Sequence, residues 1–432
     1  MRSGIGTQVL LKVALVGFGT VGQSVARILC TRTSAGLALT HIANRRVERK
    51  RVDWVPADVV WTDDFERVVS SDADVVVELI GGVDPAAGWI RRALEAGKSV
   101  VTANKQVIAQ CGDGLLALAG ERRRHLLFEA AVAGGIPAIR GLREGLAGDR
   151  LVRVEGVLNG TCNYILTRMA DAQVSFSAGL AEAQKLGYAE ADPSADLDGA
   201  DARAKLAILS LVGLRRRIDV EAVPLASIRA IDPIDFAYAR RLGCTIRQVA
   251  RAELLADERR VLAFVRPALV PLSSNLARIE GNQNVVVVEG AFGGEASFSG
   301  AGAGGGPTAV SVVSDLEAIA RAGADGHAGW PAAPAADGVE REFEAPHYAR
   351  FIVADRPGII ASVAEVFSRH GVNVDAVLQE PGWSKAELPF VVTLERCSSA
   401  VVNEALAEIG SFDFHVRRPV WVPILASEGG RS

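Results

Sequence analysis

The sequence predicts an α/β protein of three parts: a Rossmann-type, doubly wound domain, a second mixed α/β domain, and a C-terminal ferredoxin-like domain. Three observations support this. Short apolar segments alternate with helix-like segments up to about residue 128, as in a parallel sheet covered by helices. From Leu151 the pattern becomes irregular. Beyond residue 346 the expected elements follow the order βαββαβ.

The first element is a β-rich run, Lys12–Phe18, which leads into a glycine turn and then a helical pattern. Apolar segments at 37–43, 75–80, 99–102 and 126–128 alternate with helix-like stretches such as Trp89–Ala96. Strands separated by helices in this way pair in parallel. We therefore expect a doubly wound sheet.

The second domain is expected to contain an open sheet. The expected strands are Val152–Leu158, Val261–Val265 and Val285–Glu289, and the expected helices are Tyr164–Ala172, Phe176–Leu186 and Ala200–Val212. Gly300–Pro307 is too rich in glycine for any regular element, and a helix is expected from Thr308 to Ala322.

Residues 323–345 are rich in Ala, Pro and Gly without a period, which predicts an interdomain linker. After it we expect strands at 349–354, 372–379, 390–394 and 414–419, with helices at 359–370 and 400–409. The predicted domains are 1–140, completed by 306–322; 141–305, which also carries the dimer contacts; and 346–432.

Composition excludes several classes of function. The net charge is −4, from 47 basic and 51 acidic residues, and there is no long run of like charge, so neither nucleic acid nor a membrane is an expected partner. The five cysteines are scattered, which disfavours a disulfide framework or a zinc site and fits the cytoplasm. The apolar stretch Val9–Val16 is interrupted by Lys12 and is interpreted as a strand, not a signal peptide.

The glycines at 17, 19 and 22 form the spacing G-x-G-x-x-G between the first strand and the first helix. In dinucleotide-binding proteins these glycines permit a tight turn, a close approach to the pyrophosphate, and packing of helix on strand. A plain strand-to-helix turn is the alternative. At the end of the second strand stands Asn44-Arg45-Arg46 in place of an acidic residue. Because an arginine there can pair with a 2′-phosphate, Arg45 favours NADP(H), with NAD(H) left open.

Several longer motifs then occur in order, and together they resemble homoserine dehydrogenase over roughly residues 10–322. The motifs are ELIGGVDPA from residue 78, VVTANK from 100, FEAAVAGGIP from 128, LNGTCNYIL from 158 and LGYAEADP from 186. The resemblance implies interconversion of L-homoserine and L-aspartate 4-semialdehyde with NAD(P), in threonine, methionine and isoleucine biosynthesis. It also implies a homodimer or homotetramer acting on small-molecule substrates.

The densest group of charged residues is Glu190, Asp192, Asp196, Asp198, Asp201 and Lys205. Asp201 and Lys205 are four residues apart on an expected helix and so share a face, and an arbitrary pair of this kind is an ordinary surface ion pair. The resemblance makes Lys205 the acid/base catalyst, with Lys105 beside cofactor and substrate. It makes Glu190 the ligand of the substrate amine and Asp201 a second substrate-contacting, catalytic carboxylate. Only seven of the 47 basic residues are lysines, so lysine is the exception in this chain.

The resemblance adds further ligands. Beside Gly17, Gly19, Gly22 and Arg45, it implies cofactor contacts at Thr20, Val21, Thr102, Lys105, Gly187 and Gly302. It also implies a monovalent cation, Na⁺ or K⁺, held by Glu129 and the backbone carbonyls of Val132, Gly134 and Ile136, although a plain turn is the alternative. Two positions depart from the family pattern, with Arg247 where lysine is usual and Cys162 where threonine is usual.

The C-terminal segment resembles the ACT domain in Arg350–Ile360 and Phe367–Val374. This module binds small amino acids, and the resemblance implies threonine feedback, with Asp355, Gly358 and Asn373 near the ligand. A dimerisation prop is the alternative. Two other functions remain open for the chain: another nicotinamide-dependent enzyme of small amino acids or aldehydes, and an amino-acid sensor with a vestigial nucleotide domain.

Overall fold

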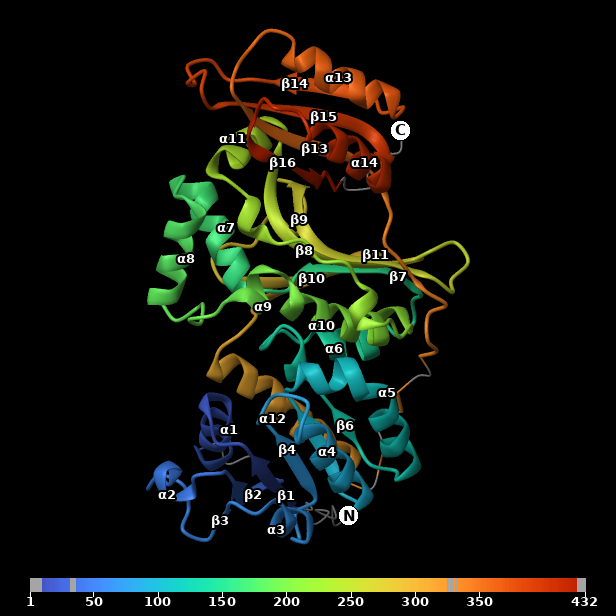
Figure 1. Ribbon diagram of the computed structural model, residues 1–432. Coiled ribbons are helices and arrows are strands. Elements are labelled where there is room, and N and C mark those ends of the chain that lie inside the picture. The colour runs from blue at the N-terminus through green and yellow to red at the C-terminus, as the bar shows by residue number, and fades with distance from the viewer. Residues whose placement is uncertain (1–9, 32–35, 325, 327–328, 331–332, 426–432) are drawn as a thin grey trace, which may run out of the picture.

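The computed structural model describes residues 10–31, 36–324, 326, 329–330 and 333–425. Three domains are stacked in chain order into an elongated molecule, with the N-terminal domain at one end and the C-terminal domain at the other (Figure 1). In the described part of the chain, no helix is both long and apolar enough to cross a membrane.

The N-terminal domain has a six-stranded sheet in the order β3-β2-β1-β4-β5-β6, with every pairing parallel. The strands are β1 (Leu11–Val16), β2 (Leu37–Ala43), β3 (Val60–Thr62), β4 (Val75–Glu78), β5 (Ser99–Thr102) and β6 (Leu126–Leu127). The helices are α1 (Thr20–Thr31), α2 (Val47–Lys50), α3 (Phe65–Val69), α4 (Ala86–Glu95) and α5 (Lys105–Glu121). The predicted doubly wound sheet is confirmed. Strand β3 was not predicted, because three residues are too few to show a period.

Helix α12 (Gly305–Ala322) returns to this domain and packs against α1 (Figure 1). Its side chains Val312, Leu316 and Ile319 lie in the same apolar cluster as β1. The prediction of no element in Gly300–Pro307 was wrong, because α12 begins at Gly305 and β11 ends at Ala301. A Cβ at position 305 would lie 2.9 Å from Ser24 Oγ, so close packing of helix on helix outweighs the low helix propensity of glycine here.

The middle domain has a sheet in the order β11-β10-β7-β8-β9-β12. Its strands are β7 (Leu151–Val157), β8 (Cys244–Leu254), β9 (Val261–Pro271), β10 (Gln283–Gly290), β11 (Gly294–Ala301) and β12 (Val339–Glu340). Its helices are α6 (Ala138–Arg140), α7 (Gly160–Ala172), α8 (Phe176–Lys185), α9 (Ser194–Leu197), α10 (Ala200–Leu209) and α11 (Pro233–Arg241), and short 3₁₀ or π turns occupy Glu129–Ala131, Gly141–Gly145, Ser210–Leu214, Val220–Ala222 and Ile228–Ala230.

Strand β8 was not predicted, because polar side chains interrupt its apolar pattern. One of them, Arg247, is buried and donates hydrogen bonds to the carbonyl oxygens of Ile246, Ala277 and Ile279. The arginine that stands where the family usually has lysine therefore supports a loop of the middle domain.

The segment predicted as an interdomain linker is partly structured. Its residues Val339 and Glu340 form β12, which pairs in parallel with β9. Trp330 stacks on Phe128 with ring centroids 4.6 Å apart and donates a hydrogen bond to the carbonyl oxygen of Leu126. This segment is bound to β9 by backbone pairing and to Phe128 by an aromatic contact. Neither contact produces a periodic pattern in the sequence.

The C-terminal domain has the predicted order βαββαβ: β13 (Glu344–Val353), α13 (Ile359–Arg369), β14 (Val374–Leu378), β15 (Leu388–Ser398), α14 (Ser399–Ile409) and β16 (His415–Pro423). Its antiparallel sheet has the order β14-β15-β13-β16. Tyr348 from β13 donates a hydrogen bond to Asp235 of α11 over 2.7 Å, so the domain is bound to the middle domain.

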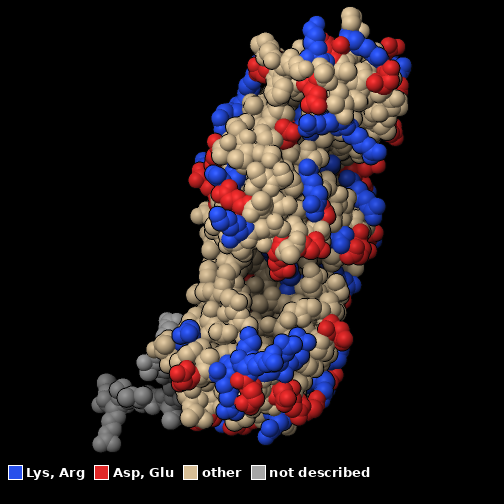
Figure 2. Space-filling model, turned by 60° about the vertical axis from the view of Figure 1, so that its left-hand side comes forward, with Lys and Arg blue, Asp and Glu red and all other residues tan. Residues whose placement is uncertain are grey.

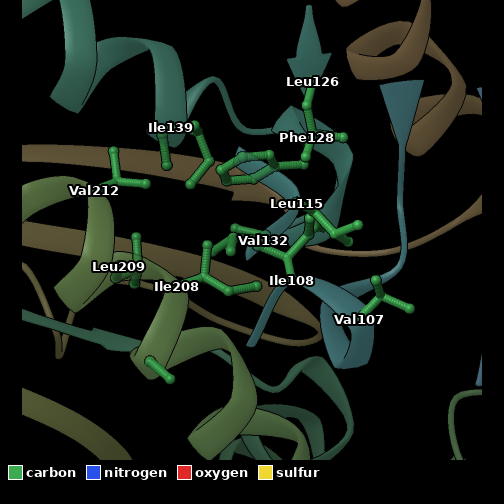
Figure 3. Close-up of a cluster of buried hydrophobic side chains, with 14 of the residues drawn as sticks. Val107, Ile108, Leu115, Leu126, Phe128, Val132, Ile139, Ile208, Leu209 and Val212 are labelled. Atoms are coloured by element: carbon green, nitrogen blue, oxygen red, sulfur yellow. The ribbon is translucent and has the colours of Figure 1, made fainter. Parts of the chain in front are cut away.

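The N-terminal and middle domains share one apolar core where α5 meets α10. Figure 3 shows Ile108 and Leu115 of α5 facing Ile208 and Leu209 of α10, with Phe128 and Val132 beside them. Both helices also carry predicted site residues, Lys105 at the start of α5 and Lys205 within α10. Packing of these apolar side chains therefore fixes the relative position of the two lysines.

The His347 ring in β13 is fully buried. From this burial we predict that the stability of the folded protein depends on pH. Burial lowers the pKa of His347 to about 4, against about 6.5 in an unfolded chain. Between pH 6.5 and pH 4 the unfolded chain binds a proton at His347 that the folded protein does not. The free energy of unfolding therefore decreases as the pH falls from 6.5 towards 4, by up to about 3 kcal/mol. The thermal midpoint of wild type should therefore fall more between pH 7 and pH 5 than that of His347→Phe. The control is His370→Phe, beside Glu408 at the surface. Equal falls in wild type and His347→Phe would contradict the prediction.

Candidate active site

Lys105 is the first residue of α5, and a chain of hydrogen bonds fixes the start of this helix. The buried Glu78 at the end of β4 accepts from Thr102 Oγ1 over 2.6 Å. Thr102 Oγ1 accepts from the backbone N–H of Asn104. Asn104 is the N-cap of α5, and its side chain accepts from the N–H of Val107. The position of Lys105 is therefore set by polar contacts at the carboxyl ends of two neighbouring strands.

Asp201 and Lys205 lie one turn apart on α10 and are both buried. Lys205 Nζ lies 2.8 Å from Asp201 Oδ2 and donates to the carbonyl oxygen of Leu158 over 2.7 Å. Lys105 Nζ lies 2.5 Å from Asp201 Oδ1. One carboxylate thus bridges two ammonium groups from two domains. The predicted Asp201–Lys205 pair is therefore no ordinary surface ion pair.

The charges of this cluster determine the ionisation of Asp201. Burial opposes its ionisation, but the positive charges of Lys205 and Lys105 outweigh that effect and hold the pKa of Asp201 well below its usual range. The two lysines therefore favour the ionised form of Asp201, which lies between them. Burial raises the pKa of the neighbouring Asp196 carboxyl, and a hydrogen bond from Asn159 opposes this rise.

Figure 2 shows the surface hollowed between the N-terminal and middle domains. Glu190 and Gly187 lie in the loop between α8 and α9 and are exposed. The Thr161 hydroxyl donates to the carbonyl oxygen of Tyr188 over 2.6 Å, which ties this loop to the start of α7. The structure does not bring the Glu190 carboxylate into contact with the lysine cluster, so the roles of Glu190 and Gly187 stay predictions.

The glycine motif has the backbone geometry expected of a dinucleotide-binding turn. Gly17 has φ +105°, and a Cβ there would lie 2.8 Å from the carbonyl oxygen of Leu79. A Cβ at Gly22 would lie 2.2 Å from the carbonyl oxygen of Gly17, so α1 packs directly on the turn. Nothing lies within 4 Å of a Cβ built at Gly19. Thr20 and Val21 open α1, where the helix dipole and free N–H groups favour a phosphate.

A pocket of about 500 Å³ adjoins this turn at the carboxyl ends of β1, β2 and β4. Gly17, Gly19, Asn44 and Arg45 line it. The Asn44 side chain accepts from the N–H of Phe18 over 3.3 Å and so braces the glycine turn. Arg45 thus stands at the pocket's edge, where it is exposed and available to an anionic group.

Two predicted cofactor contacts have a packing role of their own. A Cβ at the buried Gly302 would lie 2.1 Å from the side chain of Asn284, so glycine is required there by the middle domain. The Thr102 hydroxyl both donates to Glu78 and accepts from Asn104. These observations explain both residue types without a cofactor, and contact with the nucleotide stays a prediction for both positions.

The predicted cation loop has an unusual backbone. Ala133 and Gly134 are consecutive residues with positive φ, +55° and +53°, which an alanine rarely adopts. Glu129 is buried, and its two oxygens each accept from a backbone N–H, of Ile139 and of Arg140, over 2.8 Å. Burial raises the pKa of Glu129. The described residues contain no cluster of three metal-ligating side chains, and a site built from one carboxylate and carbonyl oxygens would not require one.

Comparison with known proteins decides the family. The homoserine dehydrogenase family model matches residues 137–316, and the model of its NAD-binding domain matches residues 17–129. The homoserine dehydrogenase of Mycobacterium tuberculosis is 41% identical, over 93% of this chain and 94% of its own length. The chain belongs to the homoserine dehydrogenase family. Members of this family are NAD(P)-dependent oxidoreductases, and the ACT domain model matches residues 347–413.

Solved structures of homoserine dehydrogenases have the same fold. The enzyme from Thiobacillus denitrificans aligns with a TM-score of 0.85 and 31% identity, over 97% of this chain and 99% of its own. A hyperthermophilic archaeal homoserine dehydrogenase, solved in complex with NADPH, aligns with a TM-score of 0.62 and 29% identity, over 73% of this chain and 98% of its own. The family resemblance and the fold class predicted from the sequence are therefore confirmed.

Two residues of the site, Leu158 and Asn159, were not predicted from the sequence. Leu158 supplies the carbonyl that Lys205 contacts, and Asn159 contacts both Asp196 and Asp201. Both lie in the motif LNGTCNYIL, which served only to establish the resemblance. A role for Asn159 as a helix cap could have been predicted, because an asparagine that follows a strand and precedes a helix is a common N-cap. Its contact with residues 37 and 42 positions away is set by the fold alone.

Arg45 is expected to discriminate between the two nicotinamide cofactors. Only NADP(H) carries a 2′-phosphate, and Arg45 is the arginine of Asn44-Arg45-Arg46 that lines the pocket. Arg45→Gln should weaken NADPH binding about 10-fold, the cost of one charge-assisted hydrogen bond, and NADH binding less than 2-fold. Arg49→Gln, on α2, is the control. Fluorescence titration with each cofactor tests this, and equal losses for NADPH and NADH would place the arginine away from the phosphate.

Proposed function

We propose that this chain interconverts L-homoserine and L-aspartate 4-semialdehyde with NADP(H) or NAD(H), at the site formed by Lys105, Asp201 and Lys205. The observation that supports this most directly is the bridging of two ammonium groups by one buried carboxylate, at the junction of a nucleotide-binding domain and a second domain. The exposed Glu190, on the loop beside this site, would hold the α-ammonium group of the substrate.

Reduction of the aldehyde requires a hydride at the carbonyl carbon and a proton at the oxygen. Hydride is the chemistry that a nicotinamide supplies when bound beside the glycine turn. Lys205 would donate the proton to the forming alkoxide, and in the reverse direction its neutral amine would accept the hydroxyl proton. Asp201 and the Leu158 carbonyl orient Lys205 Nζ. Lys105, whose side chain is one-third exposed, would stabilise developing negative charge on the same oxygen.

We propose further that Glu129 and the carbonyl oxygens of Val132, Gly134 and Ile136 bind Na⁺ or K⁺. Two backbone N–H groups and the nearby positive charges of Arg140 and Arg143 favour the ionised form of Glu129, but burial outweighs them and raises its pKa. A bound cation would offset this cost of burial. The paired positive φ values at Ala133 and Gly134 re-orient successive carbonyls, as an irregular ligand loop requires. Such a cation would stabilise the junction between the domains.

The C-terminal domain is proposed to bind threonine and to lower activity in response, as expected for an enzyme of threonine, methionine and isoleucine biosynthesis. Gly358, with φ +94°, opens α13, and Asp355 precedes it in the same turn. The Asn373 amide donates to Glu395 at the edge of β14. A route to the active site would run through Asp235 of α11, because α11 packs against α7 and Asp235 also pairs with Arg350 of β13 at 3.2 Å.

The proposed homodimer or homotetramer would use the middle domain. β11 is the edge of its sheet, so one side of the strand has no partner strand within the described residues. Phe292, in the turn that leads into β11, is 86% exposed. An open strand edge beside an exposed aromatic side chain suits pairing with a second copy of the chain.

Lys205→Ala is expected to lower turnover about 10²- to 10⁴-fold, the usual effect of removing a general acid or base. The dissociation constant of NADPH should change less than 2-fold, because Lys205 acts on the reacting oxygen. Lys185→Ala, on the exposed end of α8, is the matched control and should retain full activity. The assay is homoserine oxidation with each cofactor in turn. A Lys205→Ala enzyme with more than a tenth of wild-type turnover would refute the role of Lys205.

Threonine is expected to inhibit homoserine oxidation by the intact chain, and Asn373→Ala should raise the inhibitory concentration about 10-fold without changing turnover in the absence of threonine. Asn403→Ala, on α14 away from the proposed ligand, is the control. A point variant is preferable to truncation after Ala322, because the C-terminal sheet covers part of the middle domain's core. Complete insensitivity of the intact chain would leave the C-terminal domain without a threonine-sensing role.

A further inference from the structure

Asn159 is a buried side chain that the proposed mechanism does not use, although it contacts the active-site carboxylates. It follows β7 and is the N-cap of α7, where its Oδ1 accepts from the N–H of Cys162 over 2.8 Å. Its Nδ2 donates to Asp196 Oδ1 over 2.7 Å and to Asp201 Oδ2 over 3.0 Å. Every hydrogen-bonding atom of the amide is therefore engaged.

The chemistry of these partners allows only one orientation of the amide. Ionised carboxylates accept hydrogen bonds and cannot donate them, whereas a backbone N–H can only donate. A rotation of the Asn159 amide by 180° would direct its carbonyl oxygen at two carboxylates and its amino group at the Cys162 N–H. The helix cap at one end of the amide thus dictates that its donors point at Asp196 and Asp201.

The carboxylate of Asp201 is consequently held by three donors from three different parts of the fold. Lys105 of α5 contacts Oδ1, and Lys205 of α10 and Asn159 at the start of α7 share Oδ2. Asn159 is the neutral member of this set and also lies between two carboxylates that would otherwise repel each other. Without the Asn159 donors, the plane of the Asp201 carboxylate would be held only by the long side chains of Lys105 and Lys205.

We propose that Asn159 is a positioning residue for the reaction: it fixes the plane of the Asp201 carboxylate and through it the position of Lys205 Nζ. This inference rests on the proposed role of Lys205 and extends it to a residue that touches neither substrate nor cofactor in that mechanism. Small displacements of a reacting group are costly, and about 1 Å can lower a rate about 100-fold.

Two substitutions separate positioning from capping. Asn159→Asp has the shape of the native side chain and an equally good capping oxygen, but it loses both donors and adds a negative charge. Asn159→Ser also offers a capping oxygen, loses the donors and adds no charge. Ser175→Asp changes the N-cap of α8, outside the site, and is the matched control for a change of capping residue.

Both Asn159 variants are expected to lower kcat for homoserine oxidation 10- to 100-fold, with an NADPH dissociation constant within 2-fold of wild type. The groups around the amide that carry or can take up charge are Lys105, Asp196, Asp198, Asp201, Lys205 and the Cys162 thiol. An added carboxylate among them favours protonated lysines. The rising limb of kcat against pH should therefore move to higher pH in Asn159→Asp and stay in place in Asn159→Ser and Ser175→Asp.

Two results would overturn the inference. One is a kcat above half of wild type in both Asn159 variants. The other is a loss of kcat that follows a lower thermal midpoint with no movement of the pH limb in Asn159→Asp, which would show a helix cap and nothing more. Lys205→Ala, assayed in parallel, keeps the two proposals apart. An active Lys205→Ala enzyme would refute the proposed function, whereas an inactive one beside active Asn159 variants would refute only the role of Asn159.

Discussion

The ion cluster at Asp201, where the N-terminal and middle domains meet, is the constraint on which the candidate site depends. Lys105 comes from the first, Lys205 and Asp201 from the second, and the buried charges of Asp201 and Lys205 are tolerable only while they are paired. Hydrophobic residues of similar volume could fill this space at less cost. The ion cluster thus adds little to the stability of the fold, and a catalytic role accounts for its presence better. The apolar contact between α5 and α10 supplies the packing energy that holds the charges together.

Part of this site could be predicted from the sequence. The spacing of Gly17, Gly19 and Gly22 located the turn, and the distance of four residues placed Asp201 and Lys205 on one helical face. Both signals are local. The contact of Lys105 with Asp201 spans 96 positions and could be expected only through resemblance to a family. Sequence patterns describe neighbouring residues, so they cannot predict a contact between residues of two different domains.

The failures have different physical causes. Gly305 opens a helix because α1 lies too close for a side chain, so tertiary packing overrides propensity. β12 exists because β9 offers it an edge, and its two residues have no detectable period of their own. Asn159 was visible as a helix cap, but its second role depends on Asp196 and Asp201, which reach it only when α9 and α10 fold against α7.

The position of α12 has a consequence for the order in which the chain can fold during synthesis. The middle domain is inserted within the N-terminal domain, because its residues lie between β6 and α12, and α12 packs on α1. This contact can form only after residues 305–322 have left the ribosome. Until then, the face of the parallel sheet that Val312, Leu316 and Ile319 cover is open to water. The nascent chain must keep an incomplete apolar surface while the entire middle domain is made. Because translation adds about 5–20 residues per second, that surface stays exposed for many seconds.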